Sequence, residues 1–144
     1  MVLSMMTIDA KGLVAGRIAS KVAKALINEE TVTVLNAEDV VIVGGKEAIL
    51  AKYKMRVDAS VLSNPNYGPK YSRVPDRLFR RMVRNMLPTQ KSSKERIIKR
   101  LSVYNKIPEE LAKEKMLTFD EYKCNERHQS MTLKELCVLL GGRW

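Results

Sequence analysis

The sequence has few of the residues from which metal sites and nucleophilic catalytic sites are built. Its 144 residues include two cysteines, Cys124 and Cys137, with no CxxC pair, and one histidine, His128, between them. A structural zinc ion needs four thiolate or imidazole ligands, and the chain offers three. We therefore predict no metal site, and we interpret both cysteines as buried small apolar residues or as inert thiols in a reducing compartment.

Long apolar runs are also missing. A membrane-spanning helix needs about 18 or more consecutive apolar residues, and no stretch of the sequence approaches this length. The N-terminal sequence MVLSMMTIDAKG has neither the basic start nor the apolar block of a secretory signal. The expectation is a cytoplasmic protein without membrane association, folded as one domain over 1–144 with a real hydrophobic core.

Acidic residues are scarce in one segment, and this scarcity accounts for the charge of the whole chain. The chain has 26 basic and 16 acidic residues, a net charge of +10. Residues 70–106 contain twelve of the basic residues but only two acidic ones, Asp76 and Glu95, so this quarter of the chain carries the entire excess. Solvated surfaces normally mix both signs. The segregation predicts a polyanionic partner, most often a nucleic acid.

The stretch PDRLFRRMVRNMLP at 75–88 predicts an amphipathic helix over 75–87, with Pro75 in its first turn and Pro88 ending it. At 100° per residue its four arginines fall within an arc of about 100°, and the large apolar residues fill the opposite half. The planar fork of arginine suits phosphate. One face is therefore predicted to pack on a core and the other to bind phosphate; the arginines are Arg77, Arg80, Arg81 and Arg84.

The remaining pattern predicts an α/β fold. Short apolar strands at 6–12, 31–37, 40–43 and 101–105 alternate with helical periodicity at 16–27, 46–57, 75–87 and 93–101. This order favours a single compact domain with a largely parallel central sheet of about four strands, covered on both faces and flanked by helices. The residues 75–101 form basic helices, and Ser92 with Glu95 has the spacing of a capping box for the second of them.

Two further segments complete the prediction. Residues 58–74, DASVLSNPNYGPKYSRV, have no periodicity and form a loop longer than compact domains usually contain, which makes it a candidate contact element. The C-terminal region 108–144 is predicted to be helical, with a short helix at 108–115 and a last helix that is capped by Thr132 and Glu135 and ends at Gly141.

A small nucleotide-binding α/β enzyme is the alternative. GLVAGR at 12–17 has valine at position 14, where the phosphate-binding turn needs glycine. GGK at 44–46 lacks the P-loop glycine at Val40 and the hydroxyl residue at Glu47. His128 has no nucleophile partner in its polar surroundings. Asp9 and Glu38 are isolated acids of the kind that cap helices or pair with lysines. No catalytic set is predicted.

The kind of nucleic acid follows from what the basic segment lacks. It contains no helix-turn-helix, zinc finger or aromatic RNP motif. Tyr67 and Tyr71, in the loop beside the arginines, are the residues available for base stacking. Broad cationic faces with an irregular loop are better matched to structured RNA that is recognised by its shape and backbone.

Several ordered motifs resemble one family. YGPKYSRVPDRLFRRMVRNMLP (67–88), GLVAGRIAS (12–20), VLNAE (34–38) and RLSVYNKIP (100–108) closely resemble the universal large-subunit ribosomal protein L-thirteen, in its archaeal and eukaryotic form. The resemblance covers residues 6 to about 111 and, more loosely, the terminal TLKELCVLLG. Departures are Asn85, where the family often has glycine, and IPEE at 107–110, where the bacterial branch has HPH.

The resemblance implies a compact α/β domain folded onto large-subunit rRNA, with a structural and assembly role, no catalysis, no cofactor and no small-molecule substrate. It also implies contacts with neighbouring large-subunit ribosomal proteins. Together with the basic faces, including the one on helix 16–27, it indicates a candidate rRNA-binding set: Arg17, Lys21, Lys24, Lys46, Tyr67, Lys70, Tyr71, Arg73, Arg77, Arg80, Arg81, Arg84, Lys91, Lys94, Arg96, Lys99 and Arg100.

Overall fold

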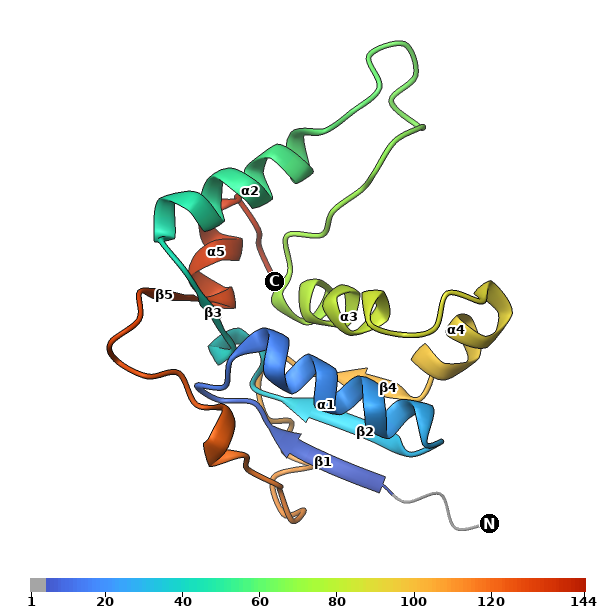
Figure 1. The fold of residues 1–144 in the computed structure, drawn as a ribbon, viewed down its shortest axis with the longest axis vertical. Coiled ribbons are helices and arrows are strands. Elements are labelled where there is room, and N and C mark those ends of the chain that lie inside the picture. The colour runs from blue at the N-terminus through green and yellow to red at the C-terminus, as the bar shows by residue number, and fades with distance from the viewer. Residues whose placement is uncertain (1–4) are drawn as a thin grey trace.

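The computed structural model describes residues 5–144, and for Lys91 and Ser92 it describes the backbone alone. Figure 1 shows most of the elements gathered around a central sheet, with the loop between α2 and α3 extending away from it. The elements are, in order, β1 (Met5–Asp9), α1 (Ala15–Ile27), β2 (Thr31–Leu35), the 3₁₀ turn η1 (Ala37–Asp39), β3 (Val41–Val43), α2 (Lys46–Asp58), α3 (Pro75–Asn85), α4 (Lys91–Ile98), β4 (Leu101–Val103), the 3₁₀ turn η2 (Asp120–Tyr122), β5 (Ser130–Thr132) and α5 (Leu133–Leu139).

The central sheet is parallel, with strand order β1-β2-β4. Ile8 lies opposite Val34, and Val34 lies opposite Val103. Because side chains alternate along a strand, these apolar residues share one face, and this face belongs to the buried core together with residues of α1 and α3. On the other face the hydroxyl of Thr7 donates to Glu114 in the segment that follows β4. The predicted α/β class is confirmed.

Helix α3 packs as its sequence pattern predicts. Leu78, Phe79 and Val83 are buried, and α3 contacts α1, β4 and α5. The segment that follows β4 holds the N-terminus of the helix. The Asn105 side-chain oxygen accepts a hydrogen bond from the Asp76 N–H at 3.0 Å. Burying a large apolar side chain contributes on the order of 1.5 to 3 kcal/mol, so this face fixes the helix and turns its arginines outward. The helix ends at Asn85, which leaves Met86 exposed.

The strand at 40–43 is present but does not join the parallel sheet. β3 pairs antiparallel with β5, which places Ile42 opposite Met131. The position beside β2 is taken by β4. The chain leaves β2 through Asn36 in the left-handed conformation (φ 58°) and the turn η1, so β3 starts in a new direction. The five described strands therefore form a three-stranded parallel sheet and a separate antiparallel pair.

Two other predictions about the elements are wrong. Residues 109–113 form consecutive turns instead of the helix expected at 108–115. Most side chains there are exposed, so a helix would lack the packed apolar face that stabilises short helices. Helix α4 begins at Lys91 with Gln90 as N-cap, which puts Ser92 inside the helix and not at its cap.

The predicted start and end of the chain's last helix are both confirmed. The Thr132 hydroxyl accepts a hydrogen bond from the Glu135 N–H at 3.2 Å, which satisfies one of the free amides of the first turn of α5. Gly141 has φ +84°, a conformation that glycine adopts without strain. The Gly142 N–H then donates to the Cys137 carbonyl at 2.8 Å and closes the helix.

Candidate nucleic-acid interface

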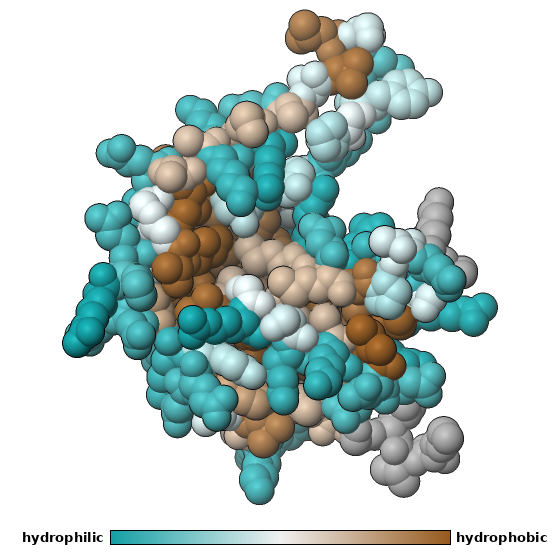
Figure 2. All heavy atoms as spheres, viewed as in Figure 1, coloured by the Kyte–Doolittle hydropathy of each residue, from teal (hydrophilic) through white to brown (hydrophobic). Residues whose placement is uncertain are grey.

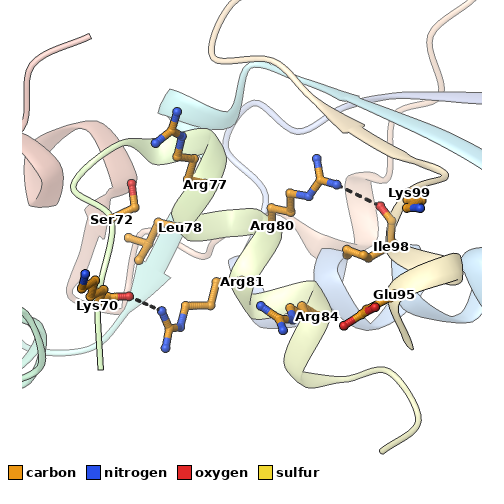
Figure 3. Close-up of a pocket in the computed structure, with 10 residues that line it drawn as sticks. All are labelled: Lys70, Ser72, Arg77, Leu78, Arg80, Arg81, Arg84, Glu95, Ile98 and Lys99. Atoms are coloured by element: carbon orange, nitrogen blue, oxygen red, sulfur yellow. Dashed lines mark hydrogen bonds between the residues drawn. The ribbon is translucent and has the colours of Figure 1, made fainter. Parts of the chain in front are cut away.

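A cationic cleft of about 560 Å³ lies between α3, α4 and the end of the long loop. Figure 3 shows its lining side chains coming from these three segments. The cleft brings together six residues of the predicted set, which the sequence spreads over thirty positions. They are Lys70, Arg77, Arg80, Arg81, Arg84 and Lys99, with Ser72, Leu78, Glu95 and Ile98 completing the lining.

Two of the four arginines are held in place by backbone carbonyls. Arg81 donates from Nη1 to the Lys70 carbonyl at 2.7 Å, and Arg80 donates from Nη2 to the Ile98 carbonyl at 3.2 Å (Figure 3). The Arg81 guanidinium also lies 3.6 Å from the centroid of the Tyr71 ring, a stacked cation–π contact. These contacts orient both guanidinium groups without neutralising their charge, so the cleft presents positive charge that is already positioned.

The cleft is not neutralised by acidic groups of the chain. In the part of the chain that the structure describes, no ion pair involves a basic residue of 70–106; the three ion pairs are Lys46–Glu135, Lys123–Asp120 and Lys134–Glu38. Glu95 is the one acidic side chain in the lining. A concave surface with a large excess of one sign of charge concentrates counterions of the opposite sign, and phosphate is the polyanion for which arginine forks are suited.

A second recess, of about 450 Å³, lies under the long loop and adjoins the cleft. It contains three more of the predicted residues, Tyr67, Tyr71 and Arg73, and it shares Lys70 with the cleft. The Tyr67 side chain is 69% exposed. Apolar groups make up most of the remaining lining: Val57, Ala59, Ser60, Pro65 and Pro69.

Arg56 belongs to this region but was not predicted from the sequence. Its guanidinium carbon lies 5.5 Å from the Tyr53 ring centroid and 5.7 Å from that of Tyr71. Burial raises the pKa of the Tyr53 hydroxyl, and the positive charge of Arg56 opposes the rise. Helix α2 has no distinct cationic face that would single out Arg56. The contact arises because the loop returns Tyr71 to the end of α2.

The remaining predicted residues lie outside the cleft. Arg17, Lys21 and Lys24 are exposed on α1, and Lys21 lies 5.8 Å from the Phe119 ring centroid. Lys46 begins α2, 4.0 Å from Glu135. Three residues, Lys94, Arg96 and Arg100, belong to α4 and the turn after it but do not line the cleft. The side chain of Lys91 is outside the described residues.

The isolated acids act as structural groups. Asp9 accepts a 2.7 Å hydrogen bond from the Asn36 amide. Glu38 is buried, and its carboxylate accepts from the Trp144 indole N–H at 2.6 Å and lies 3.6 Å from Lys134. Over residues 5–144 no group of three or more histidine, cysteine or acidic side chains is arranged to hold a metal. In the same range no helix combines the length and apolar character needed to cross a bilayer.

An α/β domain with an unneutralised arginine cleft has the characteristics of a protein that binds a polyanion. Comparison with known proteins identifies the family. The model of ribosomal protein L13 matches residues 4–110, and the chain belongs to this family.

Archaeal relatives resemble the chain over nearly its whole length. The large ribosomal subunit protein uL13 of Methanosphaera stadtmanae is 43% identical over 95% of this chain and 97% of the relative. The protein of the same description from Methanocaldococcus jannaschii is 39% identical over 97% and 100% of the two chains. That of Thermoplasma acidophilum is 35% identical over 96% and 99%. The resemblance to the archaeal form of the family is confirmed.

Proposed function

We propose that this chain is a structural constituent of the large ribosomal subunit in the cytoplasm, that it binds and stabilises large-subunit rRNA, and that it contributes to assembly of the subunit. Family membership supports the structural role, since the family consists of ribosomal components and not of enzymes. The alternative, a small nucleotide-binding enzyme, has no support in the family or in the site.

The arginine cleft carries the proposal for rRNA. The four arginines of its lining lie on α3, whose opposite face is packed in the protein core, so binding needs little rearrangement. Contacts to the RNA backbone and to its shape are the usual way in which proteins bind double-helical RNA. In this proposal Arg77 and Arg84 contact phosphates, while Arg80 and Arg81 contribute charge from fixed positions. The basic residues of α1 and α4, together with Lys46, extend the proposed rRNA-binding surface beyond the cleft.

Neighbouring ribosomal proteins are the second class of partner that we propose. Val138 and Leu139 are adjacent, exposed residues at the end of α5, and Met55 is exposed on α2. Figure 2, which has the same view as Figure 1, shows apolar side chains at the surface in the region of α5 and the neighbouring part of α2. Scattered exposed apolar residues are common, and these are offered as contact points within the subunit.

Sedimentation tests the function. A tagged copy of the chain, expressed in an archaeal host, should remain with large subunits through a high-salt wash, because structural ribosomal proteins are held by many contacts at once. A small basic protein such as lysozyme, added at the same concentration, should be removed by that wash. Release of the chain at the same salt as the added protein, together with saturable micromolar binding of NAD or ATP, would replace the structural role with the enzymatic alternative.

A further inference from the structure

We propose that the recess under the loop holds one unstacked nucleobase of the rRNA, while the phosphates on one side of that nucleotide lie in the arginine cleft. This inference rests on the proposed function, since it names the element of RNA that this part of the surface recognises. It begins from the fact that the two recesses are adjacent and share one residue, Lys70.

The lining of the loop recess has the chemistry of a base-binding site. Val57, Pro65, Pro69 and the two tyrosine rings provide apolar and aromatic surface. Lys70 and Arg73 provide positive charge, and the lining contains no acidic residue. Its volume of about 450 Å³ lies within the range of roughly 300 to 1,000 Å³ typical of small-molecule sites. An aromatic surface bordered by cations matches a planar base attached to a phosphate backbone.

The two tyrosines have different roles in this site. Tyr71 is half-buried and is already stacked with Arg81, whose Nη1 is tied to the Lys70 carbonyl. Tyr71 therefore forms a fixed wall of the recess and contacts Arg81, which lines the cleft. Tyr67, in contrast, is 69% exposed, and in the described residues its ring has no aromatic or cationic stacking partner. We assign the stacking of the base to Tyr67 and a positioning role to Tyr71.

The occupant is a base from a loop, bulge or strand end, because bases within an A-form helix are stacked on their neighbours and cannot enter a recess. The cations alone would also accept an acidic protein segment, but the aromatic and apolar lining of the loop recess, beside a cleft lined by four arginines, matches a base joined to phosphates better. A continuous RNA strand can satisfy both recesses at once: phosphate in the cleft and base under the loop.

Salt-titrated binding to large-subunit rRNA fragments, compared for the parent, Tyr67→Ala and Tyr67→Phe, tests the inference. Stacking on an aromatic side chain is worth about 1 to 3 kcal/mol per base, so Tyr67→Ala should weaken binding roughly 5- to 140-fold. The slope of log affinity against log salt should stay unchanged, because no phosphate contact is lost. Tyr67→Phe should bind like the parent. Because Tyr67 is exposed, both variants should unfold at the parent's temperature.

A chemical probe of base edges, applied to the bound fragment, provides a second readout. One unpaired base should be protected by the parent and by Tyr67→Phe, but not by Tyr67→Ala. Equal affinity of Tyr67→Ala and the parent would overturn the base site, and so would a Tyr67→Phe variant as weak as Tyr67→Ala, since a hydroxyl contact is not stacking. Loss of binding to whole subunits but not to rRNA fragments would assign the recess to a protein neighbour. In all three cases the proposed function stands; it fails instead if the parent itself does not bind rRNA.

Discussion

Residues that are equivalent in the sequence pattern have different roles in the structure. The four arginines of α3 lie on one face, yet two of them donate to backbone carbonyls and two, Arg77 and Arg84, have no side-chain hydrogen bond among the described residues. A guanidinium that is already hydrogen-bonded keeps its charge but has fewer donors for a ligand. In the proposed rRNA complex, the free pair is therefore where loss of an arginine would most directly remove a phosphate contact.

The salt dependence of rRNA binding should report this pair. Each phosphate contact contributes roughly 0.7 to 0.9 to the slope of log affinity against log salt, so Arg77→Ala with Arg84→Ala should reduce the slope by about 1.4 to 1.8. Folding stability should change by less than about 0.5 kcal/mol per site. The double variant Lys113→Ala with Lys115→Ala removes the same charge from an exposed segment outside the predicted set and serves as control. An unchanged slope in the arginine variant would contradict the phosphate assignment.

At the scale of the element, α3 separates two functions on its two faces. Its apolar face packs on α1, β4 and α5, and its cationic face forms one wall of the cleft. The N-terminal end of the helix is fixed by the side chain of Asn105, which follows β4. The direction of the arginines is therefore set by core packing. A change in the core face should affect stability first and binding only through unfolding.

Phe79→Ala tests this separation. Phe79 is fully buried, and replacing a buried phenylalanine by alanine typically costs about 3 to 5 kcal/mol because the lost contacts leave a cavity. We expect urea unfolding to show a loss of that size, and the folded fraction at low urea to keep the parent's salt slope with rRNA. Arg84→Ala, one turn along the opposite face, is the matched control and should unfold like the parent. A Phe79→Ala protein as stable as the parent would mean that this face does not carry the core.

At the scale of the whole molecule, elements from the middle and from the C-terminal end of the chain meet around Cys137. This residue of α5 is fully buried, and its thiol is close enough to Asp76 in α3 and Tyr53 in α2 to influence titration. Burial, and to a smaller extent the negative charge of Asp76, raises the pKa of Cys137 from 9.0 to about 12. The charged thiolate is thus disfavoured in the packed arrangement of these three helices.

Stability should consequently fall at alkaline pH. Between pH 9 and 12 the unfolded chain has lost the Cys137 proton while the folded chain retains it, so raising the pH favours unfolding in this window. Below pH 9 both states hold the proton, and the contribution is constant. Urea unfolding at several pH values should show a smaller loss above pH 9 for Cys137→Ala than for the parent, with the nearly isosteric Cys137→Ser giving the same difference. Parallel curves for all three proteins would contradict the assignment.

The local sequence pattern was enough to predict much of this protein's secondary structure and its family. Periodicity located four helices within a few residues, including α3 with its two faces, because the spacing of apolar residues records which side of a helix is buried. The parallel character of the sheet and the capped start of α5 were also predictable. The basic segment indicated a polyanionic partner, and the ordered motifs indicated the family, which the comparisons confirm.

Contacts between distant residues were decided by the tertiary structure alone. The sequence could not show that β4 occupies the position beside β2 and leaves β3 to pair with β5, since strand pairing depends on competition between segments far apart in the chain. The roles of Arg80, Arg81, Tyr71 and Arg56 were equally hidden, because each depends on a carbonyl or ring that the folded chain brings close. Composition and periodicity determine which residues are buried or charged; only the packed fold determines which of them meet.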